Sequence, residues 1–276
     1  MTQLIQTGDG SPTLYVPALD EHYHSTHGAI QEAEHVYVGA GLTEGLKRGM
    51  PVLRVLEMGF GTGLNALLTW EFGEGGEARS EERGARSEEP GVRSEEPGAR
   101  SEKGGVRGRE QEEWSREGEV RGEGMGGSGA GRVIRYEAIE KFPLSPALAE
   151  RFLAALPADE ARRAGYRALH GAAWEEEVAL GEGFTLLKRQ GGFEELDFGP
   201  GGYDVIYYDA FAPRKQPELW TDEVLGRAGN LLAPGGVIVT YCATGALKRA
   251  WRAVGLAVES LPGAPGKREM VRARRG

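Results

Sequence analysis

Two acidic residues stand where a folded chain can do chemistry. Glu57 lies two positions before the first glycine of the run Gly59, Gly61 and Gly63, and Asp209 directly follows the mostly apolar residues 203–208. The first carboxylate is placed to attract a cationic ligand that rests on the glycines. The second can accept hydrogen bonds from an amine, orient its lone pair and take its proton. A structural cap on the following turn is the alternative role for Asp209.

The glycine run links a predicted strand to a predicted helix. Residues 52–56 are too few and too β-branched for a buried helix and indicate a strand of a parallel sheet, whereas residues 64–68 favour a helix. Glycines permit a tight turn and a close backbone approach, and the free N–H groups of the helix start point at the same place. We therefore expect a nucleotide-like cofactor in this crevice. A glycine-rich turn without a ligand is the plainer alternative.

The spacing of the glycines distinguishes between cofactors. Glycines in this pattern follow strands in dinucleotide folds and in methyltransferases, but the run lacks a third glycine at the distance that a pyrophosphate turn requires. The Glu57 carboxylate would repel a pyrophosphate and attract the ammonium and sulfonium groups of S-adenosylmethionine. The pattern favours S-adenosylmethionine.

The remaining apolar runs alternate with helical segments, as in a doubly wound α/β fold. We expect helices over residues 145–156 and 223–231, a sharp turn over 232–236, and a final antiparallel pair of strands. The fold class is predicted as a Rossmann-like class I methyltransferase with a seven-stranded, mostly parallel sheet and a terminal antiparallel strand. The further predicted strands are residues 133–139, 184–187, 203–208, 237–241, 258–261 and 269–273.

An acidic residue at the end of the second strand of such a fold is placed to accept hydrogen bonds from a ribose diol. Glu140 holds this position, and Glu137 is the second choice.

Residues 73–131 are predicted to be an insertion that does not join the core. The segment has no Leu, Ile, Phe or Tyr, and a block related to Arg-Ser-Glu-Glu-Pro-Gly recurs around Arg86, Arg93 and Arg100. Such a segment buries too little apolar surface to offset its ordering entropy, so we expect it to be poorly ordered or disordered. A tolerated loop expansion and a charged tether for RNA or a partner are both open. Roughly 215 other residues suffice for one α/β domain.

Charge is distributed unevenly along the chain. The formal net charge is −9, and residues 73–131 carry 15 acidic and 10 basic residues of the total. Residues 203–276 instead hold 11 Lys or Arg against 7 Asp or Glu, several as the adjacent pairs Arg214-Lys215, Lys248-Arg249, Lys267-Arg268 and Arg274-Arg275. A basic face for a polyanion is one interpretation, and ordinary solvated side chains are the other.

Several classes of protein are not indicated. The single cysteine, Cys242, excludes a disulfide framework, and the spacing of His22, His24 and His27 fits no standard metal pattern, so no metal is expected. The start of the chain has no signal-peptide pattern, and no apolar run approaches the ~20 residues that span a bilayer. We expect a cytoplasmic protein without a membrane partner.

Several ordered motifs together resemble one known family. The chain resembles the methyltransferase domain of the bacterial tRNA wobble-uridine enzyme MnmC and its standalone form MnmD over nearly its whole length except the insertion. The motifs are Gly59-Phe60-Gly61-Thr62-Gly63-Leu64-Asn65, Ile139-Glu140-Lys141-Phe142-Pro143-Leu144, residues 207–221 with Tyr208-Asp209-Ala210-Phe211-Ala212-Pro213, and Lys267-Arg268-Glu269-Met270, with Asp9 to Tyr15 and Tyr23-His24-Ser25 near the start.

The resemblance implies transfer of a methyl group from S-adenosylmethionine to the amine of 5-aminomethyl-(2-thio)uridine at the wobble position of tRNA. It implies residues 1–50 as an N-terminal segment that contributes to the substrate site and residues 51–276 as the methyltransferase domain, without the flavin oxidoreductase unit of bifunctional MnmC. Asp209 would be the catalytic residue and Asn65 would join Glu57, the glycines and Glu140 at the cofactor. The substrate residues would be Tyr23, Phe211, Pro213, Lys215, Trp220, Lys267 and Arg268.

For some of these residues the residue type and position leave more than one role open. Phe211 and Trp220 can stack on a splayed base or simply pack in the core, and Arg214 and Lys215 can contact phosphates. Where relatives tend to carry a Gly-Asp pair that contacts the adenine, this chain has Gln190, Gly191, Gly192 and Phe193. Either Gln190 or Glu194 replaces that acid, or backbone groups near Gly192 suffice, or the cofactor is held less tightly.

Two rival functions are compatible with the same sheet. An aminopropyltransferase of the spermidine-synthase type would need a second set of acids for a polyamine, whereas the segment after Asp209 supplies the bases Arg214 and Lys215. A noncatalytic tRNA-binding protein on a degenerate fold would bind RNA without binding a cofactor.

Overall fold

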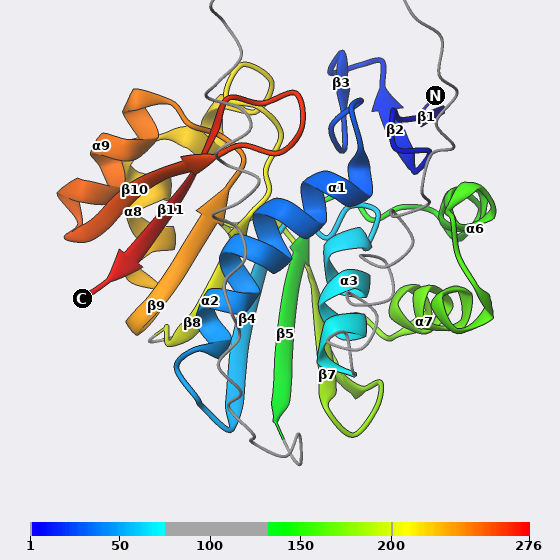
Figure 1. Ribbon diagram of the computed structural model, residues 1–276, viewed down its shortest axis with the longest axis horizontal. Coiled ribbons are helices and arrows are strands. Elements are labelled where there is room, and N and C mark those ends of the chain that lie inside the picture. Colours follow the sequence, from blue (N-terminus) through cyan, green and yellow to red (C-terminus); the bar gives the residue numbers. More distant parts are fainter. Residues whose placement is uncertain (1, 75–131, 200) are drawn as a thin grey trace, which may run out of the picture. The chain divides into compact units, whose positions relative to one another are not determined.

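An eight-stranded sheet organises the chain (Figure 1). The computed structural model describes residues 2–74, 132–199 and 201–276. The insertion predicted over residues 73–131 lies outside the described residues, except for its first two residues, of which Gly73 ends a helix.

The order of the sheet is β10-β11-β9-β8-β4-β5-β7-β6, and its five central strands are parallel. Strand β11 is antiparallel to β9, β10 to β11, and β6 to β7. The seven predicted strands are all present, and β6 is an addition. The bounds are β4 (Val52–Met58), β5 (Val133–Glu140), β6 (Glu177–Ala179), β7 (Phe184–Gln190), β8 (Tyr203–Tyr208), β9 (Leu232–Thr240), β10 (Leu256–Pro262) and β11 (Glu269–Arg275).

The turn predicted over residues 232–236 is wrong, because these residues form the first half of β9. The pairing of β8 with β9 shifts its register between Tyr203 and Val205, so the strand absorbs the glycines there as an irregularity rather than as a turn.

Side chains alternate between two cores, one on each face of the sheet. On β4, Val55 joins the first core and Leu56 the second, and on β8 Tyr207 and Tyr208 divide in the same way. This is the period of two that a strand covered on both faces requires.

Helices α8 (Asp222–Asn230) and α9 (Gly245–Ala253) cover the second core. Their N-caps are Thr221 and Thr244, whose side chains accept hydrogen bonds from the first turn. The first core is covered by α3 (Leu64–Gly73), α6 (Pro146–Ala155) and α7 (Glu160–Gly171), together with an N-terminal helix. The helix predicted over residues 145–156 is confirmed, with Ser145 as its N-cap.

The N-terminal helix was not predicted. It consists of α1 (Ala29–Ala33), a π-helical stretch η1 (Glu34–Leu42) and α2 (Thr43–Leu46), which follow one another without a break and cross in front of β4 and β5 in Figure 1. Two glycines let it approach the sheet closely: a Cβ at Gly41 or Gly45 would lie within 3 Å of side chains of β9 or β8. This approach brings the middle of the helix to the carboxyl ends of the central strands.

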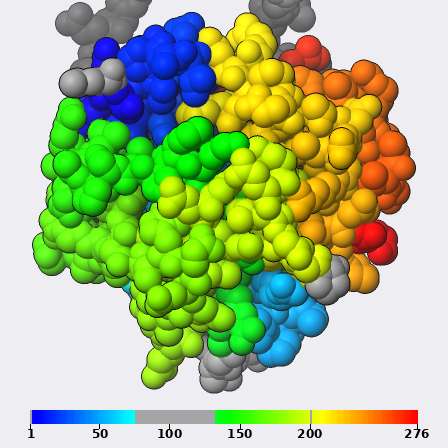
Figure 2. Space-filling model, turned by 180° about the vertical axis from the view of Figure 1, so that it is seen from behind, coloured from blue at the N-terminus to red at the C-terminus, as the bar shows by residue number. Residues whose placement is uncertain are grey.

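A small antiparallel sheet of β1 (Gln3–Gln6), β2 (Pro12–Val16) and β3 (Glu21–His22) precedes that helix. It lies at the end of the large sheet where β4, β5 and β8 finish, and the segment before β4 lies at the opposite end (Figure 1). Figure 2 shows the same placement from behind, with the N-terminal segment in dark blue at the top and residues near 50 in light blue at the bottom. Among the described residues no helix is long and apolar enough to cross a membrane.

The close approach of the N-terminal helix can be tested by substitution. Gly45→Ala is expected to lower the free energy of unfolding by about 1 kcal/mol or more, because its Cβ would lie 2.4 Å from Cγ2 of Val205 on a buried strand. Gly171→Ala, also in a helix but with no atom within 4 Å of the new Cβ, should keep or raise the stability. Urea denaturation measures both, and equal stability of the two variants would contradict the packing described here.

Candidate active site

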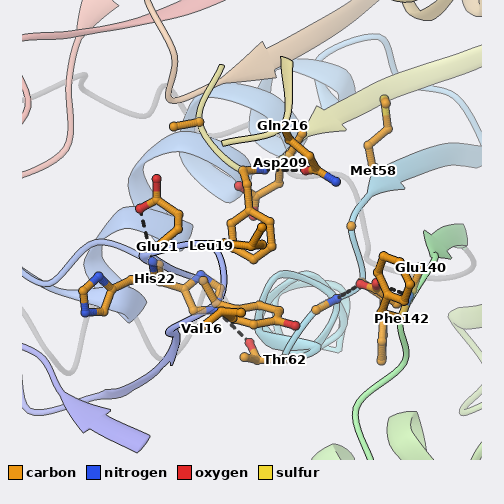
Figure 3. Close-up of a pocket in the computed structure, with 18 of the residues that line it drawn as sticks. Val16, Leu19, Glu21, His22, Met58, Thr62, Glu140, Phe142, Asp209 and Gln216 are labelled. Atoms are coloured by element: carbon orange, nitrogen blue, oxygen red, sulfur yellow. Dashed lines mark hydrogen bonds between the residues drawn. The ribbon is translucent and has the colours of Figure 1, made fainter. Parts of the chain in front are cut away.

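A cavity of about 890 Å³ opens at the carboxyl ends of β4, β5 and β8. Strand β4 has β5 on one side and β8 on the other, so the order of the sheet reverses at this point, which is where open α/β sheets bind ligands. Figure 3 shows Asp209 and Gln216 on one side of the cavity and Glu140 with Phe142 on another. The lining residues that matter below are Tyr23, His24, Glu32, Gly59, Gly61, Asn65, Glu140, Phe142, Gly192, Phe193, Asp209, Phe211, Tyr241 and Lys267.

The predicted glycine turn forms one wall of the cavity. Gly59 and Gly61 both have positive φ, of 95° and 50°. A Cβ at Gly59 would lie 2.9 Å from the carbonyl oxygen of Asp209, and one at Gly61 would lie 3.0 Å from the ring of Tyr23. Both positions therefore require glycine, for conformation and for space. Gly63 is the left-handed N-cap of α3 and lies outside the cavity lining.

Glu140 fastens this turn to the end of β5. Its Oε2 accepts a hydrogen bond from the Gly61 N–H at 2.9 Å, and its Oε1 accepts one from the Phe142 N–H at 2.8 Å. The residue lies in the cavity wall where the ribose contact is predicted, and that contact stays a prediction. Glu137 is bound instead to Arg189 and Tyr203, outside the lining.

Asn65, in the first turn of α3, links two carboxylates. Its Nδ2 donates to Oε1 of Glu57 at 2.9 Å and to Oδ2 of Asp209 at 2.8 Å. The residue is only 2% exposed, yet it reaches the cavity lining. One amide group therefore holds side chains from β4 and from the end of β8 in a fixed relation.

Asp209 is one of the acidic groups that line the cavity. Besides the Asn65 bond, its Oδ1 accepts a hydrogen bond from the Tyr37 hydroxyl at 2.5 Å. Burial raises the pKa of Asp209 to about 7; the Tyr37 hydrogen bond opposes this rise and the charge of Glu32 adds to it. The carboxyl group is thus able to accept or release a proton near neutral pH.

Glu57 is more deeply placed than its sequence position suggests. It is 1% exposed and does not line the cavity, because Asn65 covers it. Burial, followed by the neighbouring charge of Asp209, raises its pKa well above the usual range. Its contact with the cavity runs through Asn65, and its predicted role at the cofactor stays a prediction.

The N-terminal segment covers the glycine turn. The ring of Tyr23 packs edge-on against Phe211, with centroids 5.1 Å apart, and Nε2 of His24 is 2.7 Å from the Thr62 hydroxyl. Burial lowers the pKa of His24 to about 4, so its imidazole is neutral at pH 7. Residues of the predicted N-terminal segment and of the predicted methyltransferase domain thus line one cavity.

A partly buried ion pair lies at another part of the cavity wall. Lys267 is paired with Glu32, and its Nζ lies 3.8 Å from the ring centroid of Tyr241. The second oxygen of Glu32 accepts the Ser25 N–H at 2.7 Å. The loop after β10 is therefore held against α1 and the N-terminal segment at the cavity.

The predicted substrate residues divide into two groups. Tyr23, Phe211 and Lys267 line the cavity. The other four, Pro213, Lys215, Trp220 and Arg268, lie outside its lining. The Lys215 ammonium pairs with Asp20, and the Trp220 indole donates to the Phe211 carbonyl at 2.8 Å. Pro213 lies between Phe211 and Lys215, and Arg268 is exposed.

The adenine region predicted near Gly192 also lies at the cavity. Gly191, Gly192, Phe193 and Glu194 line it, whereas Gln190 does not. Glu194 is paired with Lys141 at 3.0 Å, so its carboxylate already has a partner. Of the predicted replacements for the family's acid, Glu194 and the Gly192 backbone are in position, and their contact with an adenine stays a prediction.

The sequence interpretation missed three groups at or beside the cavity. Tyr37 is a buried aromatic residue in a helix and Tyr241 a partly buried one after a strand, with no local pattern that marks them as polar partners. Phe142 is 71% exposed at the cavity and had an available signal, since it directly follows the Glu140-Lys141 pair at a strand end. Among the described residues no group of three or more His, Cys, Asp or Glu is arranged to hold a metal ion.

The protonation of Asp209 can be measured directly. In protein with ¹³C-labelled aspartate carboxyls, the Asp209 signal is expected to titrate near pH 7. Tyr37→Phe should move the midpoint upward, because the hydroxyl stabilises the ionised form. Tyr241→Phe removes a hydroxyl that donates to the Ala210 carbonyl instead and is the matched control. A midpoint near 4 in the unsubstituted protein would refute the description of this group.

Comparison with known proteins supplies independent information. A family model described as S-adenosyl-L-methionine-dependent methyltransferase matches residues 189–276. The chain is 30% identical over 276 residues to the tRNA 5-methylaminomethyl-2-thiouridine biosynthesis bifunctional protein MnmC of Cupriavidus metallidurans, a match that covers 98% of this chain and 33% of that protein. The chain thus spans about a third of the length of the curated relatives that it matches over nearly its whole length.

Two solved structures resemble the fold. MNMC2 from Aquifex aeolicus gives a TM-score of 0.64 at 21% identity, covering 99% of this chain and 69% of that one. Spermidine synthase from Thermotoga maritima gives 0.51 at 12% identity, covering 100% and 69%. Both likenesses concern the fold, and they agree with the predicted α/β class and its mostly parallel sheet.

Proposed function

We propose that this chain, which belongs to the S-adenosyl-L-methionine-dependent methyltransferase family represented by the MnmC proteins, methylates tRNA. The methyl group is transferred to the amine of a 5-aminomethyl-(2-thio)uridine at the wobble position. The product is the 5-methylaminomethyl nucleoside that the relatives' name contains. We place this activity in the cytoplasm, in agreement with the single, reduced Cys242.

The cavity fits the family's cofactor. Gly59 and Gly61 leave a bare backbone where a side chain would fill the space. The buried Oδ1 of Asn65 has no hydrogen-bond partner among the described residues, so a polar group of the methionine part can satisfy it. Glu140 is our candidate for the ribose contact and Gly192 with Phe193 for the adenine contact, because all three residues line the cavity.

When bound, S-adenosylmethionine supplies an electrophilic methyl group: the amine nitrogen gains the carbon as the carbon–sulfur bond breaks, and that electron pair stays on sulfur. The amine must be neutral before it can react, because an ammonium ion has no lone pair. Asp209 accepts a proton from the nitrogen and orients the N–H groups, so the lone pair points away from the carboxylate. Tyr37 and Asn65 hold the carboxylate in place for this task.

Recognition of the substrate falls to the residues around Asp209. Tyr23 and Phe211 present ring edges and faces to the cavity, and Phe142 exposes its ring at the same opening, so all three suit a base that has left its stack. Arg214, at the cavity, and Arg268 are exposed and suit the phosphates of the anticodon loop. Trp220 supports Phe211 through its indole N–H rather than meeting the base itself.

A single observation carries the proposal: a carboxyl group with a pKa of about 7 stands in the cofactor cavity, fixed by two hydrogen bonds. An amine substrate needs a proton acceptor of this kind. The rival noncatalytic protein has no need for such a group, and burying a carboxyl group whose pKa rises on folding would be a cost without a return.

The reaction is tested with labelled methyl groups. We expect transfer from S-adenosylmethionine to tRNA bearing 5-aminomethyl wobble uridine and none to unmodified tRNA. Asp209→Asn should lower kcat/KM by about 100-fold or more, since a general base is lost, and the unsubstituted rate should rise with pH through about 7 as the carboxyl loses its proton. Asp197→Asn, at a position outside the cavity, is the control. Tight tRNA binding without any transfer would support the noncatalytic rival instead.

Cofactor binding is tested separately from the reaction. Gly61→Ala should raise the Kd for S-adenosylmethionine by about tenfold or more, because the new Cβ crowds Tyr23, which lines the cavity, and strains the turn. Gly49→Ala also meets positive φ, of 67°, but has open space around its Cβ and lies outside the cavity, so it should bind normally. Isothermal calorimetry compares the two, and equal affinities would remove the turn from the binding site.

A further inference from the structure

The contact that links Glu57 to the cavity is an unusual one for two acids. A single amide nitrogen, Nδ2 of Asn65, donates one proton to Glu57 and the other to Asp209. The nitrogen has two hydrogens and both are used. Two carboxylates thus lie on either side of one neutral donor, with Glu57 and Asn65 almost fully buried and Asp209 at the cavity.

We propose that Glu57 is protonated and neutral in the working protein, and that it serves as a positioning residue which holds the Asn65 amide so that the amide binds the Asp209 carboxylate. The inference deepens the proposed function and rests on it for the activity measurements alone.

The buried oxygens around Glu57 support the neutral form. Oε2 of Glu57 has no hydrogen-bond partner among the described residues, and neither has the hydroxyl of Tyr136. The Tyr136 hydroxyl lies near this oxygen without meeting hydrogen-bond geometry, and its influence lowers the pKa of Glu57 by less than burial raises it. An anionic oxygen in this position would have at most this one hydroxyl as a donor, fewer than a buried charge requires, whereas a protonated oxygen is neutral and loses far less.

Asp209 has the surroundings that favour charge, so the proton falls to Glu57. Asp209 receives hydrogen bonds from Tyr37 and Asn65, and Lys267 also favours its ionised form. Glu57 receives the Asn65 bond and has no cation beside it in the described structure. When two nearby acids compete, the better solvated and better paired one ionises first.

The elements packed against the pair bring one cation and several acidic or phenolic groups near it. The ionisable groups that act on Asp209 and Glu57 are Glu32 of α1, Tyr37 of η1, Tyr136 and Glu140 of β5, Tyr207 of β8, Tyr241 after β9 and Lys267 after β10. Lys267 is the only cation in this set, and Glu32 already pairs with it. No member of the set supplies Glu57 with a compensating positive charge.

A neutral Glu57 has a different role from the one that its position before the glycines suggests. As an anion it would attract the cofactor's positive charge from behind Asn65. As an acid it sets the orientation of one amide, and its carbonyl oxygen still accepts the Asn65 hydrogen bond. The two forms predict different results for Glu57→Gln, since glutamine reproduces the shape and hydrogen bonding of the neutral acid.

The first test measures protonation in the full chain without cofactor or tRNA. With ¹³C-labelled carboxyls, the Glu57 signal should not titrate between pH 5 and pH 8 and should have the shift of a protonated acid. The Asp209 midpoint should be unchanged in Glu57→Gln, whereas Glu32→Gln, which removes an ionised neighbour, should lower it. A Glu57 signal that titrates below pH 7, or an Asp209 midpoint lowered equally by both variants, would overturn the inference.

The second test separates positioning from simple packing. Glu57→Leu removes the acceptor of Asn65 and is expected to lower kcat for methyl transfer at least tenfold with little change in KM for tRNA, and to raise the Asp209 midpoint. Glu57→Gln should recover most of both losses and bind S-adenosylmethionine within about fivefold of the unsubstituted protein. Recovery by Gln of neither quantity in a folded variant would contradict the inference.

The outcomes keep the two proposals apart. If no protein transfers methyl groups to tRNA, the proposed function fails, while the carboxyl titrations still decide the state of Glu57. If transfer occurs and Glu57→Gln loses cofactor affinity by a hundredfold, the acid acts as a charge and the positioning inference fails alone.

Discussion

The parallel pairing of β4 with β5 on one side and β8 on the other is the constraint on which the site depends. Met58 is level with Ile139 of β5 and with Tyr208 of β8. The three strands therefore end together, and the glycine turn, Glu140 and Asp209 emerge at one edge of the sheet. A shift of one strand by a single residue would turn its side chains to the opposite core and separate these groups.

Hydrogen bonds then fix what the strands bring together. Glu140 binds the Gly61 N–H, Asn65 joins β4 to the end of β8, and Tyr37 reaches Asp209 from the helix that crosses the sheet. Each bond also satisfies a polar group that burial would otherwise leave unpaired, so the geometry of the site is tied to the stability of the fold.

The acidity of the site has a thermodynamic consequence. The Asp209 carboxyl binds its proton more tightly in the folded chain than in the unfolded chain, because its pKa is raised to about 7 from 3.8. Its contribution to folding stability is therefore favourable in acid and declines as pH rises between these two values. This loss falls on the group that we propose as the proton acceptor for the amine, and the partly buried pair of Lys267 with Glu32 nearby limits the accumulation of negative charge.

The sequence by itself determined the parts that depend on local pattern. The strand before the glycines, the turn itself, and the acids at the ends of β5 and β8 follow from β-branched runs, from the lack of a side chain at Gly59 and Gly61, and from strand-end position. Only the tertiary structure decided the rest. It showed that Glu57 lies behind Asn65, that Tyr37 binds Asp209, and that Lys215 and Trp220 have partners of their own. These contacts join residues far apart in the chain, and burial depth and the pKa values that follow from it depend on which surfaces meet, which no local pattern encodes.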